Sequence, residues 1–344
     1  MYVYKNFNLI NILRFSGGHI IWLTLWATAV TIILSYAPLS ISIPWRPLGV
    51  IGIAVAFYVG FKNNSSYGRL WEARKIWGAI VNSSRAWGSN IRSYISNQFA
   101  SENLSEDQLK QWHKKLIYRH LGWIYSLRSQ LLIPTPWEHI SQGKHVRRIT
   151  EIRRKRFGIG LVDDGATESI LKQSLPTDEY QQLIGYQNTA TQIIDRQSQD
   201  LHELRRLNLI DDFRHMELQK ILNDFYTFQG QCERIKKFPF PRQYGSVSFI
   251  FIALFIFLLP IGMVSEFAQL GEYGGWLSIP FTVLIGWVFV MMELVGDYSE
   301  NPFEGLGNDI PMLSICRTIE IDLKEMLGEA DVPAPIEAKN GVLM

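Results

Sequence analysis

Long uncharged runs alternate with charged stretches along this chain. Residues 20–45 contain no charged side chain, and residues 47–61 form a shorter apolar run that ends at Lys62. Two more uncharged runs cover residues 243–265 and 273–292. A membrane-spanning helix needs about 20 mainly apolar residues. The pattern therefore predicts four transmembrane helices in two hairpins, with a long polar region between the hairpins.

The charges beside these runs predict their orientation. The link between the first two runs has Arg46 as its only basic residue, and the link between the last two has none. The other ends of the runs are flanked by Lys5, Arg14, Lys62, Arg69, Arg74, Lys75, Arg234, Lys236, Lys237 and Arg242. Because basic residues concentrate on the cytoplasmic side, we expect both termini and the long middle region in the cytoplasm.

The middle region reads as helical. Trp71, Ile76, Ile80 and Trp87 recur at near-helical spacing, and a second helical pattern runs towards Pro134, where prolines interrupt it. The basic stretch 145–157 is typical of a solvated helix face. We expect an all-α membrane protein divided into residues 1–62 with the first two spans, 63–242 as a cytoplasmic helical domain, 243–295 with the last two spans, and 296–344 as a cytoplasmic segment.

Composition excludes several other classes of protein. Apolar residues make up 47% of the 344 residues, and the net charge is only +2. A nucleic-acid binder driven by bulk charge and an extended disordered chain are therefore excluded. The two cysteines, Cys232 and Cys316, are too few for a disulfide scaffold or a four-cysteine zinc site.

The sequence has no arrangement typical of an enzyme. His113 and His120 lie seven residues apart without a carboxylate at ligand spacing, and the paired glycines flank apolar runs rather than follow strands. No serine lies in a nucleophile elbow. We therefore expect no catalytic residue, no metal site and no cofactor.

The second apolar run has a regular face. Gly49, Ile53, Phe57 and Phe61 recur every four residues and so share one side of a helix. The helix pattern then continues into the polar stretch 62–74 without a stop signal. Such a helix suits the lining of an axial pathway, but the same face also suits packing against neighbouring spans. Spacing alone favours packing and leaves both interpretations open.

Three blocks of sequence resemble the bestrophin family in its bacterial form. They are NNSSYGRLWEARKIWGAIVNSSRAW at 63–87, FQGQCERIKKFPFPRQY at 228–244 and ENPFEGLGNDIPMLSICRTIEIDLKEML at 300–327. The resemblance implies a homopentameric ion channel with one axial pore, embedded in the bacterial inner membrane. It implies a chloride-type anion channel; the alternatives are a sodium-permeable channel of the same fold, or a non-conducting scaffold or receptor. The implied partners are small monovalent ions, copies of the same chain and the lipid bilayer, but no nucleic acid.

The resemblance also implies particular pore residues. Alignment through Arg69 places the family's apolar neck, a gate of three residues, at Ile53, Phe57 and Phe61. A second, cytosolic aperture falls at Met216 as first choice and Phe213 as second. Animal members carry a dense acidic run after Asn-Pro-Phe that helps to hold calcium. Residues 304–309 here offer few of the six or more oxygen ligands that calcium needs, so calcium activation is not expected.

Overall fold

The computed structural model describes residues 1–36, 41–100, 102–157, 165–271 and 273–344. In these ranges the chain consists of helices and their connections, with isolated bridges as its only β-type pairing. The expected all-α fold is confirmed for this part of the chain. The chain divides into two compact units. We call Tyr4–Arg69 with Pro239–Glu300 the membrane unit, and Met1–Val3, Leu70–Phe238 with Asn301–Met344 the polar unit.

The membrane unit is built from apolar helices. They are α1 (Leu9–Tyr36), the first part of α2 (Trp45–Tyr94), α9 (Arg242–Phe267) and α10 (Gly274–Asp297). Helices α1, α9 and α10 contact one another. A buried apolar cluster, which includes Leu48, Val55 and Leu259, holds the unit together. Burial of such side chains, and close packing between the helices, stabilise the unit.

Within the described residues, three stretches are long and apolar enough to cross a membrane: α1, the stretch that contains α9, and α10. Helix α2 is not among them, because its apolar part ends at Lys62 and polar residues follow. The number of four spans stays a prediction.

The first uncharged run, residues 20–45, is not one helix. Helix α1 begins at Leu9 and ends at Tyr36, and α2 begins at Trp45. Residues 37–40 lie outside the described part of the chain. Pro44 and Pro47 flank the start of α2 and lack the N–H that a helix continuing from α1 would need there. Prolines are well tolerated at a helix start, so the same residues favour a new helix.

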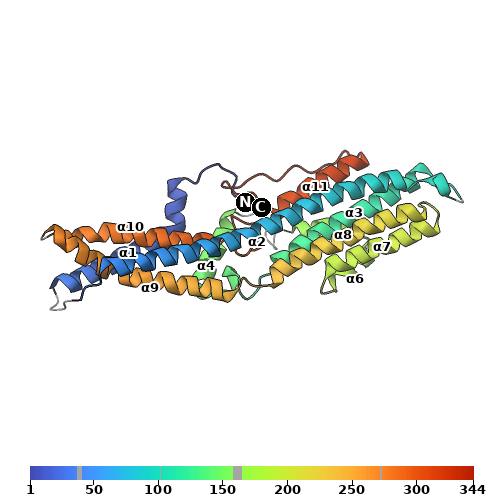
Figure 1. Cartoon of the computed structure of the whole chain (residues 1–344). Coiled ribbons are helices and arrows are strands. Elements are labelled where there is room, and N and C mark those ends of the chain that lie inside the picture. Colours follow the sequence, from blue (N-terminus) through green and yellow to red (C-terminus); the bar gives the residue numbers. More distant parts are fainter. Residues whose placement is uncertain (37–40, 101, 158–164, 272) are drawn as a thin grey trace. The chain divides into compact units, whose positions relative to one another are not determined.

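Helix α2 is one uninterrupted helix of 50 residues (Figure 1). The prediction that the second apolar run continues into a polar helix is therefore confirmed. Residues of α2 up to Arg69 belong to the membrane unit, and those from Leu70 belong to the polar unit.

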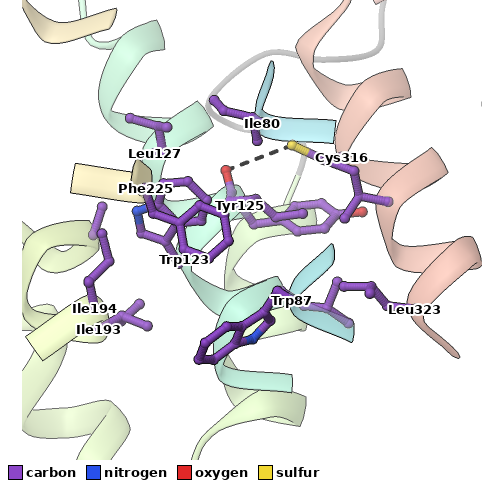
Figure 2. Packing of buried hydrophobic residues seen from close by; sticks show 14 of the residues in the cluster. Ile80, Trp87, Trp123, Tyr125, Leu127, Ile193, Ile194, Phe225, Cys316 and Leu323 are labelled. Atoms are coloured by element: carbon purple, nitrogen blue, oxygen red, sulfur yellow. Dashed lines mark hydrogen bonds between the residues drawn. The ribbon is translucent and has the colours of Figure 1, made fainter. Parts of the chain in front are cut away.

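The helices of the polar unit after α2 are α3 (Glu106–Leu132), α4 (Lys144–Phe157), α5 (Ala166–Ser174), α6 (Thr177–Ile184), α7 (Thr189–Arg206), α8 (Asp212–Lys237) and α11 (Met312–Leu327). Of these, helices α5, α7, α8 and α11 contact α3. Helix α3 begins with a capping box between Ser105 and Gln108 and ends before Pro134, as the sequence predicts. Figure 2 shows the apolar centre of the unit, with Trp123 and Phe225 among its buried rings.

His120 lies inside this aromatic core as a neutral side chain. It is fully buried, its ring lies 4.5 Å from that of Phe225, and its Nε2 lies 2.8 Å from the hydroxyl oxygen of Ser84. Burial lowers the pKa of His120 from 6.5 to about 3. The folded state therefore resists protonation that the unfolded state accepts.

We expect this difference to make the polar unit sensitive to acid. The contribution of neutral His120 to stability is complete above pH 6.5 and is lost progressively as the pH falls from 6.5 towards 3. A His120→Gln variant should flatten the fall in melting temperature between pH 7 and pH 5, measured by thermal unfolding in detergent. The exposed His202 provides the control. If His202→Gln flattens the curve equally, the effect does not come from burial.

Candidate functional site

The predicted neck residues form an exposed apolar column on α2. The exposed fractions of Ile53, Phe57 and Phe61 are 73%, 68% and 52% in the single chain. The rings of Phe57 and Phe61 meet edge to face, with their centroids 4.5 Å apart. By contrast, Val55 and Val59 are 4% and 0% exposed. Within one chain the column therefore contributes little to packing, and the opposite side of the helix is buried.

Close helix contacts hold α2 in this rotation. A β-carbon on Gly52 would lie only 2.9 Å from the ring of Phe255 on α9. In the same way, a β-carbon on Gly262 of α9 would lie 2.6 Å from the side chain of Leu48. Small residues at both positions let the two helices approach closely. The face that carries Gly52 is thus fixed against α9, and the column must face away from it.

A buried ion pair adds a polar connection directly after the column. The Lys62 ammonium pairs with the Glu293 carboxylate of α10, and the Lys62 and Glu293 side chains are only 1% and 13% exposed. Ser248 of α9 donates a hydrogen bond to the Glu293 Oε2 at 2.5 Å. We call Lys62, Glu293 and Ser248 the clamp. Charges among apolar helices are costly unless they are paired, so the clamp ties α2 to α9 and α10.

The neighbouring Asn63 supports the same contact. Its side-chain amide donates to the main-chain oxygen of Met292 at 2.9 Å. A β-carbon on Gly296 would collide with the Asn63 side chain, so only glycine fits there without movement.

The clamp was not predicted from the sequence. Lys62 was expected only as the end of the second apolar run, and Glu293 is the first charged residue after the fourth. The signal was present, because two residues of opposite charge end two apolar runs. Their pairing depends on α2 and α10 being neighbours, which local pattern does not specify.

The predicted aperture residues lie on α8 in the polar unit. Phe213 and Met216 are 82% and 69% exposed, whereas Leu218 and Leu222 on the other side of α8 are fully buried. Both candidates thus point away from the core of their unit. The described geometry does not distinguish the first choice, Met216, from the second.

The carboxylates after α10 already have partners within the polar unit. Glu304 accepts hydrogen bonds from Asn301 at 2.8 Å and lies 2.8 Å from Nδ1 of His139. Asp309 accepts from the main-chain N–H of Leu306 at 3.0 Å, and burial with the nearby Glu304 charge raises the pKa of Asp309 to about 7. Among the described residues, no group of three or more His, Cys, Asp or Glu is arranged to hold a metal ion. Glu304 and Asp309 act there as hydrogen-bonding residues of the loop.

Comparison with known proteins relates this geometry to one family. The model of the Bacterial/Fungal Bestrophin protein family matches residues 14–325. The voltage-dependent anion channel-forming protein YneE of Escherichia coli is 26% identical over 313 residues, which cover 91% of this chain and 86% of YneE. A voltage-dependent anion channel-forming protein of Mesorhizobium japonicum is 28% identical over 284 residues, covering 83% and 75% of the two chains.

Solved structures agree on the fold. A bacterial bestrophin homologue from Klebsiella pneumoniae, crystallised with a point mutation, superimposes with a TM-score of 0.72 at 21% identity. The match covers 91% of this chain and 99% of that chain.

Proposed function

Because this chain belongs to the bacterial and fungal bestrophin family, we propose that it forms an ion channel that conducts monovalent anions such as chloride. The names of its relatives, which are anion channel-forming proteins, support anion conduction rather than an enzymatic reaction. The observation that carries the proposal is the exposed column Ile53, Phe57 and Phe61 on a helix whose other side is buried.

We propose that five copies of the chain assemble around one axis with their columns facing it. An exposed apolar column is not by itself unusual. On a helix whose other side is packed, such a column suits a pore lining to which several copies of the chain contribute. In a ring, the aromatic side chains narrow the path and remove water from it, and such a constriction gates by dewetting. Met216, or failing that Phe213, forms a second narrow ring.

A mass measurement tests the assembly. Purified in mild detergent, the protein should give a mass of about five times that of the 39.7 kDa chain by native mass spectrometry. The number five comes from the resemblance to the bestrophin family, and a ring of copies encloses the column that a single chain exposes on one side. A monomer or dimer under these conditions would contradict the proposal.

We also propose that both termini and residues 63–242 face the cytoplasm of a bacterial cell. The bias of basic residues supports this orientation. The two ends of the chain also meet, since the main-chain N–H of Leu343 donates to the oxygen of Met1 at 2.8 Å, which suits termini on one side of a membrane.

Reconstitution in liposomes tests the function. With a sodium chloride gradient across the bilayer, the reversal potential should lie close to the equilibrium potential of chloride. The control is the same measurement with the chloride replaced by a large impermeant anion, which should remove most of the current. A reversal potential close to that of sodium would indicate the cation-permeable alternative. Absence of current from a well-folded preparation would favour a scaffold or receptor.

A further inference from the structure

Helix α4 concentrates positive charge that the proposed ion pathway does not use. It contains seven basic residues and one acidic residue, Glu151, and it belongs to the polar unit. The basic residues are Lys144, Arg147, Arg148, Arg153, Arg154, Lys155 and Arg156. A cluster of this density on a helix surface attracts partners that carry negative charge.

One side of α4 is anchored to the rest of the polar unit. Thr150 is fully buried, and the Arg154 guanidinium donates to the main-chain oxygen of Glu304. Arg147 Nε donates to the main-chain oxygen of Ile140 at 3.0 Å. These contacts fix which side of the helix faces outwards (Figure 1 shows α4 in green).

The outer side combines charge with an exposed aliphatic residue. Ile152 is 57% exposed, and Arg148, Lys155 and Arg156 beside it are exposed as well. Arg148 lies four residues before Ile152, and Lys155 and Arg156 lie three and four residues after it. At these spacings the three basic residues surround Ile152 on the helix surface. An apolar side chain surrounded by cations is typical of helices that lie at the surface of a membrane.

The residues before α4 pair with residues that lie close in sequence to two membrane helices. Just before α4, Glu138 pairs with Lys236, and Nδ1 of His139 lies 2.8 Å from a carboxylate oxygen of Glu304. Lys236 precedes Arg242, the first residue of α9, by six positions, and Glu304 follows the last residue of α10 by seven. Connections of only six and seven residues therefore join these anchors to α9 and α10.

We propose that the outer side of α4 binds the phosphate headgroups of anionic lipids in the cytoplasmic leaflet. The leaflet's negative potential attracts basic segments that come within about 8–10 Å of it. Ile152 then enters the boundary between headgroups and acyl chains. This inference rests on the proposed orientation of the polar unit but not on ion conduction, so a failure of one leaves the other testable.

Hydrogen exchange on the full-length protein tests the proposal. In nanodiscs of phosphatidylcholine mixed with phosphatidylglycerol, the amides of residues 144–156 should exchange severalfold more slowly than in phosphatidylcholine alone. High salt should remove the difference, because it screens the attraction. Equal exchange in both lipids would overturn the proposal. The same result is expected if a neighbouring copy of the chain covers α4 in every lipid, and it would count against the proposal too.

Matched variants separate this surface from general charge effects. Arg148→Gln, Lys155→Gln and Arg156→Gln together should abolish the lipid-dependent protection. The control neutralises three other basic residues as glutamine, Arg205 and Arg206 of α7 and Lys172 of α5, since each pairs with an acid of the same unit. If both sets abolish protection, or neither does, the proposed surface is wrong.

A fluorescent label provides a second readout that needs no loss of charge. Both native thiols are buried, and burial raises the pKa of Cys232, so an environment-sensitive dye should react selectively at Ile152→Cys. Its emission should shift to the blue when phosphatidylglycerol is present. Inorganic phosphate added to phosphatidylcholine nanodiscs should produce neither the shift nor the protection. If it produces both, the surface binds free phosphate and the lipid proposal is overturned.

Discussion

Replacing Ile53, Phe57 and Phe61 together by alanine should increase ion flux severalfold and leave the anion preference close to that of the unmodified protein. In the proposed pentamer, five aromatic side chains at one level would narrow the axial path and remove water from a passing ion. Alanine widens the path, so hydration water accompanies the ion and the barrier falls. The change adds no charge that would favour either sign of ion. Flux assays in liposomes and the reversal potential measure both effects.

The same variant should fold almost as well as the unmodified chain. Truncating a packed core residue typically costs about 2–5 kcal/mol, but the three side chains are more than half exposed within the chain. The matched control is Val55→Ala with Val59→Ala, on the buried side of the same helix. This control should lower the melting temperature without raising flux. A well-folded triple variant that conducts no better than the original would place the gate elsewhere, with Met216 the next residue to change.

Breaking the clamp should be among the most destabilising single changes in the membrane unit. Lys62→Met leaves the Glu293 carboxylate largely buried with only the Ser248 hydroxyl as a described partner. Removal of one partner of a buried pair typically costs about 3–5 kcal/mol, because the remaining charge is uncompensated. We therefore expect a large fall in melting temperature and altered flux, since Lys62 directly follows the column residue Phe61.

A compensated variant distinguishes charge from packing. Lys62→Met combined with Glu293→Leu and Ser248→Ala removes the whole polar group, and it should recover most of the lost stability. The control is Lys172→Met, which breaks the exposed pair with Glu168 and should leave the melting temperature unchanged. If the compensated variant is as unstable as Lys62→Met alone, the clamp acts through shape rather than charge.

Local pattern predicted much of this fold because membrane helices carry their signal in their own composition. The uncharged runs that became α9 and α10 are long enough to satisfy their backbone hydrogen bonds internally, whatever their neighbours are. The extension of α2 past Lys62 was equally local, since residues 62–74 contain neither proline nor a strong stop. The boundary of α1 was wrong because absence of charge does not distinguish one helix from two separated by prolines.

The candidate site was predictable only in part. The four-residue spacing of Ile53, Phe57 and Phe61 specified that they share a face, but it did not specify whether that face is packed. The clamp could not be found at all from spacing, because Lys62 and Glu293 lie 231 positions apart in the sequence. Likewise, the basic composition of α4 was visible, but its orientation was not, because it depends on the burial of Thr150 and on the bond from Arg154 to Glu304 of a distant loop.

The helical class, the apolar segments, the charge bias and the family were predictable from the sequence, because each depends on the order of neighbouring residues or on extended blocks of sequence. The side of each helix that is exposed was not predictable in this way, because it is set by tertiary contacts. That choice depends on close contacts such as Gly52 with Phe255 and on the pairing of Lys62 with Glu293. Packing and desolvation select one rotation of α2 in which distant partners meet, and the column is exposed as a consequence of that rotation.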